Sequence, residues 1–579
     1  MLENITQAKI KSMTLKELLA LCEEIRETIT ATVLKNGGHL SSNLGIVELT
    51  VALHYVFDFP VDKVVFDVGH QCYPHKLLSG RYGDFYTLRQ KGGLSGFPKR
   101  SESPFDCYDT GHAGTAVSAA LGIAKARDVK KEDFSVISVI GDGSFNNGLV
   151  YEAFNSLRLL NTNVLLILND NGMSISPTVG SMHEYLEILS EDVAHKQKKE
   201  KHAKIFERFG FAYDGVYDGN DLEKMIEKLT EVKARLKNES VILHVMTKKG
   251  KGYAFCEDDP ESTHGISVKK SEKITEEYSA VLGRTLTRLA EKNNKIVAVT
   301  AAMTTALGLG EFFARYPDRS VDVGICEEHA TILCASMAAE GLKPYYAVYS
   351  TFLQRSFDEI VLDICEQNLP VTLCIDRAGI SGADGETHQG VFDLSFLSMI
   401  PNLTVSVPKD VREFEKMLEF SENFNAPLAI RYPREGKRVF DSADSEICLG
   451  KWEKLLDCGG KYAIIACGER AVTVALSAAE KLAEDKICVS VINARFVKPL
   501  DSSMLDGLVE SNLITVEDNM LFGGLGSLIN SYFSTDGKIV KNFAYADKFI
   551  PHGGVGELMC EYGVSAQAIV DYIKSNENR

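Results

Sequence analysis

Short runs of apolar and β-branched residues recur along the chain and alternate with longer stretches whose apolar positions follow a helical period. The first runs are "VVFDVG" at 64–69, "SVISVIG" at 135–141, "VLLILND" at 164–170 and "VILHVMT" at 241–247. Strands of this kind separated by helices are typical of a parallel sheet that helices cover. The pattern therefore predicts an α/β fold.

Two further series of such runs follow. One begins with "KIVAVT" at 295–300 and ends with "NLTVSVP" at 402–408, and the other begins with "KYAIIACG" at 461–468. Polar joints near 268–278 and 441–450 separate the three series. Because a domain averages roughly 150 residues, a chain of 579 residues has room for several, and we expect three parallel α/β units.

Composition narrows the class of protein. With 63 basic and 80 acidic residues, the net charge is −17, which argues against nucleic acid or an anionic membrane as the main partner and leaves room for a local phosphate pocket. The 13 cysteines include no C-x-x-C pair, so neither a zinc ribbon nor a disulfide framework is indicated, and reduced cysteines fit a cytoplasmic protein. Charge interrupts the N-terminal segment, and no apolar run approaches the roughly 20 residues of a membrane helix, so we expect a soluble chain without a signal peptide.

A Gly-Asp-Gly turn follows the run at 135–141 and is the first candidate for chemistry. A helix-period stretch at 149–160 and another strand come next, so Asp142 and Asn171 are expected just beyond the carboxyl ends of two strands, where open α/β sheets bind ligands. Their oxygens suit Mg²⁺, and Gly141 and Gly143 would let a diphosphate approach the backbone. The alternative is a glycine turn capped by an aspartate, but the asparagine at matching depth favours a diphosphate site.

This arrangement resembles the thiamine-diphosphate motif, and other segments narrow the resemblance. "GGHLSSNLG", "DVGHQCYPHK", "QKGGLSGFPKR", "MTKKGKGY", "YSTFLQRSFDE" and "RYPRE" are similar to the 1-deoxy-D-xylulose 5-phosphate synthase family. The block from Asp-Arg-Ala-Gly to Thr-His-Gln-Gly, residues 376–390, separates this family from general transketolases. The similarity extends over nearly the whole chain.

The resemblance implies a transketolase-like fold with a diphosphate domain at 1–272, a pyrimidine domain at 273–443 and a C-terminal domain without catalytic groups at 444–579. It also implies thiamine diphosphate and Mg²⁺ as cofactors. The implied metal ligands are Asp142, Asn171 and the carbonyl of Met173. The implied cofactor contacts are His70, Gly111, His112, Ala113, Gly141, Gly143, Ser144, Asn171, Met173, Ile175, Lys249, Glu327 and Phe352.

Glu327 is the candidate acid. Thiamine loses its C2 proton to its own aminopyrimidine, which becomes competent when a buried carboxylic acid hydrogen-bonds the far ring nitrogen, and Glu327 matches the family's catalytic glutamate. Burial is expected to raise its pKa. Without the family context, two acids at a helix start would be favourable partners of the helix dipole. Phe352 matches the aromatic residue that stacks on the aminopyrimidine, although alone it would be read as a core residue.

The remaining candidates surround the substrates. Five histidines lie in glycine-rich or polar loops, namely His39, His70, His112, His264 and His388. The resemblance makes His39, His70 and His388 catalytic and places His264 closer to the acceptor. Loop histidines are otherwise more often surface or capping residues. The implied substrate contacts are His39, His264, Tyr349, Arg377, Asp384, His388 and Arg434, of which the two arginines would bind phosphate. Arg431 and Arg355 are instead interpreted as surface ion pairs.

The implied activity is that of a two-carbon transferase. Pyruvate is decarboxylated and its two-carbon unit is transferred to D-glyceraldehyde 3-phosphate, which supplies isoprenoid, thiamine and pyridoxal synthesis. A homodimer is implied, with each active site built mainly between two domains of one chain. One alternative is a transketolase acting on ketose phosphates, and another is a catalytically silent paralogue with a scaffolding or regulatory role.

Two features depart from the family pattern. The chain has "HAGT" at 112–115 where a pair of serines commonly follows the histidine, so a hydroxyl contact is either lost or supplied by Thr115. The segment near 180–205 is shorter than usual and includes a charged run from Glu191 to His202, interpreted as a solvated helix face or a mobile cover. How this segment covers the active site is left open.

Overall fold

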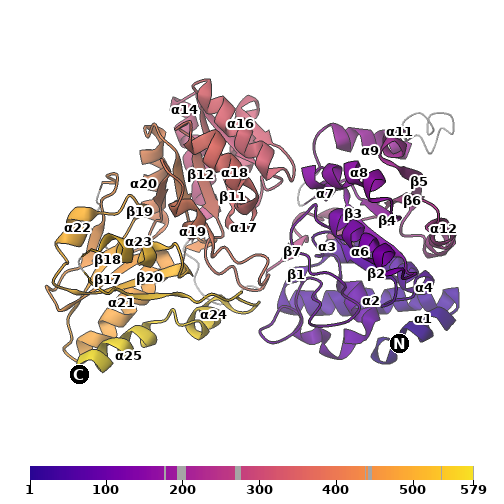
Figure 1. Ribbon diagram of the computed structural model, residues 1–579, viewed down its shortest axis with the longest axis horizontal. Coiled ribbons are helices and arrows are strands. Elements are labelled where there is room, and N and C mark those ends of the chain that lie inside the picture. The colour runs from indigo at the N-terminus through magenta and orange to yellow at the C-terminus, as the bar shows by residue number, and fades with distance from the viewer. Residues whose placement is uncertain are drawn as a thin grey trace. The chain divides into compact units, whose positions relative to one another are not determined.

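A computed structural model describes residues 1–174, 178–191, 204–267, 276–436, 438–440, 446–535 and 537–577. The chain divides into two units, each with its own sheets (Figure 1). The first comprises Met1–Lys270 together with the short segments Gly324–Cys326 and Ala383–Thr387. The second comprises the remaining residues.

The first unit is built on a parallel sheet with strand order β2-β3-β4-β6-β5. Alternate residues of its strands face opposite sides, so Ile137 and Val139 pack with α2, α4 and α12, whereas Val136 and Ile140 pack with α6 and α8. The strands are β2 (Lys63–Phe66), β3 (Val136–Gly141), β4 (Leu165–Asp170), β5 (Phe211–Asp218) and β6 (Ser240–Met246). The helices are α2 (Leu15–Asn36), α4 (Val47–Val56), α6 (Ala116–Lys130), α8 (Gly148–Leu160) and α12 (Leu222–Arg235).

The second unit contains two mostly parallel sheets. The first has the order β10-β9-β11-β12-β14-β13-β19, and only its last pair is antiparallel. Its strands are β9 (Ile296–Thr300), β10 (Ser320–Asp322), β11 (Lys343–Tyr349), β12 (Thr372–Asp376), β13 (Thr404–Ser406), β14 (Leu428–Arg431) and β19 (Phe496–Lys498).

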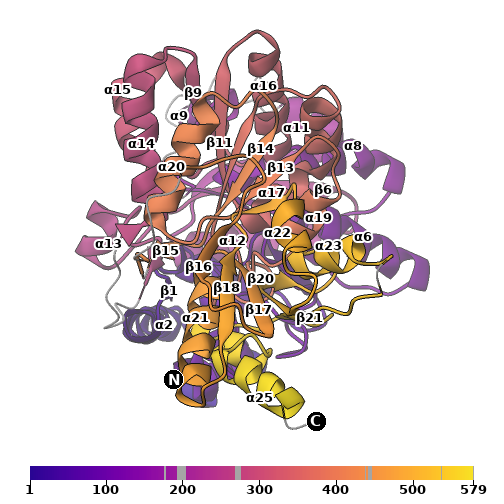
Figure 2. The ribbon, with the colours of Figure 1, turned by 90° about the vertical axis from the view of Figure 1, so that its left-hand side faces the viewer.

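The other sheet has the order β16-β18-β17-β20-β21, and α21 (Glu469–Glu484) packs against β17 and β18 (Figure 2). Its strands are β16 (Glu453–Leu456), β17 (Tyr462–Cys467), β18 (Val489–Asn493), β20 (Asn512–Met520) and β21 (Lys541–Tyr545). The predicted α/β class is therefore confirmed. The sequence pattern missed β5, whose "FAYDGVYD" is interrupted by aspartate and glycine, and short strands such as β19.

The cysteines depart from the expectation that they are reduced. Cys458 and Cys488 form a disulfide, with a Cα–Cα distance of 6.1 Å. The pairing is possible because β16 and β18 are antiparallel neighbours, which brings Cys458, two residues after β16, close to Cys488, directly before β18. Among the described residues, no helix has the length and apolar character needed to cross a membrane.

Candidate functional site

The Gly-Asp-Gly turn of the first unit lies where two neighbouring strands end. Gly141 at the end of β3 pairs with Asn169 of β4, so Asp142 and Asn171 follow adjacent strand ends, as predicted. The Asn171 backbone N–H donates to Asp142 Oδ1 at 3.4 Å, and the Thr178 hydroxyl donates to Oδ2 at 2.7 Å. The sheet register therefore brings together two residues that are 29 positions apart in the sequence.

The chemistry of this turn fits a hard cation. Burial, with a smaller contribution from Asp170, raises the pKa of Asp142 to about 7, so a bound cation would favour its ionised form. Asn171 Oδ1 is buried and has no hydrogen-bond partner among the described residues. No cluster of three His, Cys, Asp or Glu ligands occurs in the part of the chain described, so a metal here would rely on carboxylate, amide and carbonyl oxygens, as Mg²⁺ does.

Lys249 follows β6 and lies close to this turn. Its ammonium donates to the Ser174 carbonyl at 2.6 Å, and it interacts electrostatically with Asp142. Burial lowers its pKa to about 8. Met173 lies beside Ser174, whereas the predicted cofactor contact Ile175 lies outside the described residues.

Three of the predicted histidines form one cluster. The ring centroids of His39, His70 and His264 are 5.2 to 5.4 Å apart, although the three residues come from distant parts of the sequence. Asn43 holds two of them, because its Nδ2 donates to the carbonyls of both His39 and His70 at 2.8 Å. Burial, followed by repulsion from Lys249, lowers the pKa of His264 well below its usual value, so this imidazole is neutral at pH 7.

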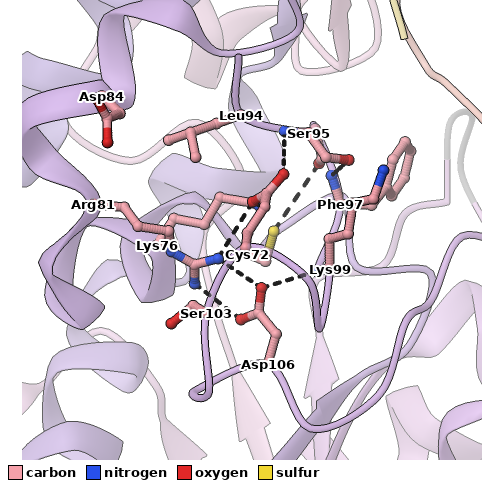
Figure 3. Close-up of polar contacts among 12 residues, drawn as sticks. Cys72, Lys76, Arg81, Asp84, Leu94, Ser95, Phe97, Lys99, Ser103 and Asp106 are labelled. Atoms are coloured by element: carbon pink, nitrogen blue, oxygen red, sulfur yellow. Dashed lines mark hydrogen bonds and ion pairs between the residues drawn. The ribbon is translucent and has the colours of Figure 1, made fainter. Parts of the chain in front are cut away.

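A buried charged network supports the loop beside these histidines (Figure 3). Arg81 donates to both oxygens of Asp106, at 2.6 and 2.9 Å, and the backbone N–H of Lys99 donates to the same carboxylate at 2.9 Å. The loop thus held carries Pro98, and a Cβ on Gly69 would come within 2.3 Å of Pro98 Cδ. The backbone next to His70 is therefore closely packed.

The predicted contacts at 111–113 lie in the loop before α6. His112 Nε2 lies 2.7 Å from the Thr387 carbonyl, and a Cβ on Gly111 would clash with Thr387. The Thr115 hydroxyl donates to the His112 carbonyl at 3.3 Å, so its proton is used locally. Asp384, from the same short segment as Thr387, forms an ion pair with Arg89.

In the second unit, Glu327 begins α16 (Glu327–Ala339) and is buried. Burial raises its pKa to about 7, and the largest opposing effect comes from Arg355, whose Nη1 lies 3.9 Å from Glu327 Oε2. That Oε2 accepts no hydrogen bond from any described residue. A buried acid that can hold a proton and has a free oxygen fits the group needed to hydrogen-bond a ring nitrogen.

Aromatic side chains lie together in the same unit. Phe352, in α17 (Ser350–Leu353), stacks on Tyr349 with ring centroids 5.5 Å apart, and it forms a T-shaped contact with His388 with ring centroids 5.7 Å apart. The Arg377 guanidinium lies 3.9 Å from the centre of the Tyr349 ring. Four predicted residues from two of the quoted segments thus form a continuous chain of contacts.

Acidic groups lie near the two predicted phosphate-binding arginines. Arg377 Nη1 lies 3.1 Å from Asp376 Oδ1, and Arg434 Nη2 lies 3.8 Å from Glu277 Oε1. Burial raises the pKa of Asp376 to about 6, although Arg377 opposes the shift. The positive charge of each arginine is therefore partly offset by an acidic side chain.

The interpretation of Arg431 as a surface ion pair was wrong. Its side chain is buried and donates from Nε to both oxygens of Asp393, at 2.9 and 2.8 Å. The reason is topological, because β14 lies between β12 and β13 and carries its last residue into the interior. Arg355 is also largely buried, beside Glu327.

Comparison with known proteins gives matches along the chain. The family model described as 1-deoxy-D-xylulose-5-phosphate synthase matches residues 2–204 and 190–247. The transketolase pyrimidine binding domain and C-terminal domain models match 275–438 and 450–569. Synthases of that name from Clostridium tetani and Clostridium kluyveri are 44% and 45% identical, over 97% of this chain and 97% and 96% of their own lengths. The one from Caldanaerobacter subterraneus is 46% identical over 99% of this chain and 98% of its own.

The chain belongs to the 1-deoxy-D-xylulose-5-phosphate synthase family. Enzymes of this synthase family are thiamine-diphosphate-dependent transferases of the transketolase class that use Mg²⁺ and condense pyruvate with D-glyceraldehyde 3-phosphate. The predicted family, transketolase-like fold, activity class and cofactors are therefore confirmed. The assignment of individual residues stays a prediction.

Sequence reasoning missed several residues that touch the predicted ones. The contact of Arg355 with Glu327 was missed because Arg355, although it lies in a segment that carried the resemblance, was interpreted as a surface ion pair. Asn43 lies in a quoted segment and Arg89 directly precedes another, but nothing local indicates their partners. Of the charged run from Glu191 to His202, residues 192–202 lie outside the described residues.

Proposed function

We propose that this chain performs the condensation of its family through the residues described above. The single observation that carries the assignment is Glu327, a buried acid whose Oε2 has no hydrogen-bond partner among the described residues. Such a group is costly to bury unless a ligand completes it. A catalytically silent copy would have no need of this acid.

When bound, thiamine diphosphate supplies the nucleophilic carbon that adds to pyruvate and accepts the electron pair released with carbon dioxide. Glu327 would hold a proton at Oε2 and share it with a ring nitrogen of the cofactor's aminopyrimidine. Phe352 would stack on the same ring. Since the pKa of Glu327 is raised to about 7, the proton is available at neutral pH.

The turn of the first unit would hold the metal and the diphosphate. Asp142, Asn171 and the Met173 carbonyl would bind Mg²⁺, and the Lys249 ammonium would offset the charge of the diphosphate. The other proposed cofactor contacts are His70, Gly111, His112, Ala113, Gly141, Gly143, Ser144 and Ile175.

The histidines would handle protons on the substrates. Addition to a keto acid and to an aldehyde both create alkoxides, which need nearby donors. His39, His70 and His388 would supply these donors, and the neutral His264 would orient the acceptor. Arg377 and Arg434 would bind the acceptor phosphate, with Tyr349 and Asp384 beside the substrate.

The remaining parts of the proposal rest on the family and on composition. They are a homodimer, a cytoplasmic location and the three domains 1–272, 273–443 and 444–579. We also infer a role in isoprenoid, thiamine and pyridoxal synthesis.

The test is incubation of the purified chain with pyruvate, D-glyceraldehyde 3-phosphate, thiamine diphosphate and Mg²⁺, each omitted in turn. We expect carbon dioxide and deoxyxylulose phosphate only when all four are present. Activity on xylulose 5-phosphate without carbon dioxide release would instead indicate a transketolase. Saturable cofactor binding without any product would indicate the silent paralogue.

A further inference from the structure

Two side chains from the C-terminal part of the chain, Asp518 of β20 and Arg470 of α21, hold the loop that carries Arg377. The Ile380 backbone N–H donates to Asp518 Oδ1 at 3.0 Å, and its carbonyl accepts from Arg470 Nη1 at 2.7 Å. Arg470 also donates to Asp518 Oδ2 at 2.8 Å. Charge-assisted hydrogen bonds therefore fix Ile380 through both its donor and its acceptor.

Asp518 is itself firmly placed. It lies in β20 and is buried, and Tyr545 of β21 donates its hydroxyl proton to Oδ1 at 2.6 Å. Arg431 donates to the Asp518 carbonyl at 2.7 Å. The loop packs closely on this carboxylate, because a Cβ on Gly379 would lie 1.9 Å from Oδ2. Gly379 also has a φ of +78°, which favours glycine.

A second set of bonds ties the two arms of the loop together. Gly379 and Gly390 exchange backbone hydrogen bonds at 2.7 and 2.8 Å. Gln389 accepts from the backbone N–H of Ser381 at 2.7 Å and donates to the Pro551 carbonyl at 3.0 Å. Movement of Ile380 would therefore be transmitted along the backbone toward Arg377.

We propose that Asp518, together with Arg470, is a positioning residue that sets the geometry with which Arg377 meets the phosphate of the acceptor. Neither residue needs to touch substrate, because both act through the backbone of Ile380. The C-terminal sheet thus contributes to acceptor selection, although it was expected to carry no catalytic group. This inference rests on the function proposed above.

The test compares Asp518→Asn and Arg470→Gln with the unmodified chain in steady-state kinetics. We expect the KM for D-glyceraldehyde 3-phosphate to rise about tenfold while kcat stays within about twofold, because one charge-assisted contact is lost at a distance from the reacting atoms. The KM for pyruvate and the kcat/KM for unphosphorylated D-glyceraldehyde should stay within about twofold. The double variant should show less than the product of the two effects, since both act through Ile380.

Glu517→Gln is the matched control. Glu517 is the preceding residue in β20 and is also buried, but its oxygens accept from the backbone N–H groups of Leu525 and Gly526, at the start of α23 (Leu525–Tyr532). This variant should lower the unfolding temperature without changing the preference for the phosphorylated acceptor.

Several results would overturn the inference. Equal losses on both acceptors, no change in either variant, or a control with the same acceptor effect would each show a merely structural role. If Asp518→Asn does not fold, Arg470→Gln decides alone, because the Arg470 side chain is 22% exposed and tolerates replacement better. Failure of the proposed function would be visible separately, as absence of product from the unmodified chain.

Discussion

At the scale of single residues, the protonation of Glu327 depends on two opposing effects, its burial and the charge of Arg355. Burial in the second unit favours the neutral acid, while Arg355 at 3.9 Å favours the carboxylate, and the balance places the pKa at about 7. A proton held at this value can be given and taken back near neutral pH. The acid and its tuning group therefore act as a pair.

Replacement of the acid should separate catalysis from binding. In Glu327→Ala we expect kcat to fall by at least about 100-fold, because the shared proton is lost. Thiamine diphosphate should still bind, since its diphosphate is held by residues of the turn at 141–144. Calorimetry of cofactor binding beside turnover assays would check this. Binding lost as completely as activity would count against the assigned role.

Replacement of the tuning group should shift the pH profile. In Arg355→Gln the opposing charge is gone, so the pKa of Glu327 rises and its proton is kept to higher pH. We therefore expect the alkaline limb of kcat/KM to move to higher pH, whereas Arg355→Lys should leave it nearly in place. An unmoved limb in Arg355→Gln would show that this limb does not report Glu327.

At the scale of elements, buried ion pairs hold the loop beside the histidine cluster. Burial opposes ionisation of Asp106, but hydrogen bonds from His75 and Arg81 outweigh it and hold its pKa well below the usual value. Lys76 likewise pairs with Glu102 at 2.5 Å within the same network. The loop is thus anchored by charge in the interior rather than by apolar packing alone.

Asp106→Asn should therefore destabilise the first unit by about 3–5 kcal/mol, because Arg81 is left with a poorly paired buried charge. A lowered folded-state pKa gives stability that is present above the unfolded pKa and is lost as pH falls below about 4. The variant should lose that acid-dependent part. Denaturant unfolding at pH 7 and pH 3 would measure both effects, and Asp84→Asn, an exposed neighbour, should change stability by less than about 0.5 kcal/mol.

The turn between β3 and α8 allows a separate prediction, which concerns the affinity for Mg²⁺. Because Asn171 Oδ1 has no hydrogen-bond partner among the described residues, Asn171→Ala should remove a ligand without breaking a side-chain bond at that atom. We expect Mg²⁺ affinity in the presence of thiamine diphosphate to fall by about tenfold to 100-fold, the effect reported for lost metal-site partners. Calorimetric titration would measure it, and unchanged affinity would exclude Asn171 from the metal shell.

At the scale of the whole molecule, the homodimer stays a proposal, and two exposed apolar side chains of the second unit are candidates for its interface. Ile332 of α16 and Leu362 of the adjacent helical turn at 360–365 are 43% and 52% exposed, on elements that pack against each other. Exposed apolar side chains on neighbouring elements are typical of interfaces. Here the proposed occupant is a second copy of the chain.

Sedimentation should accordingly give about twice the chain mass of 63.7 kDa. Leu362→Glu or Ile332→Glu should shift the protein toward the monomer, because a charge would be buried on association. Leu159→Glu is the control, since Leu159 is 85% exposed and lies in the first unit. A dimer unaffected by both test substitutions would place the interface elsewhere.

The sequence by itself determined the parts that depend on local order. Strand periodicity indicated the α/β class, and a strand, a turn and a helix in succession placed Asp142 and Asn171 at neighbouring strand ends. Glu327 could be chosen because the resemblance gave it the role of the catalytic acid and because it lies at the start of a helix. Each of these depends on residues close together in the chain.

Only the tertiary structure decided which distant residues meet. One example is the cluster of His39, His70 and His264, and another is the hydrogen bond from Ile380 to Asp518. Both join segments that are far apart in the sequence, where periodicity carries no information. Burial was decided in the same way, since Arg431 lies inside because its strand is central in the sheet. The disulfide between Cys458 and Cys488 likewise follows from the pairing of β16 with β18. Local patterns predict elements, whereas long-range packing sets the partners and the charges of the side chains they carry.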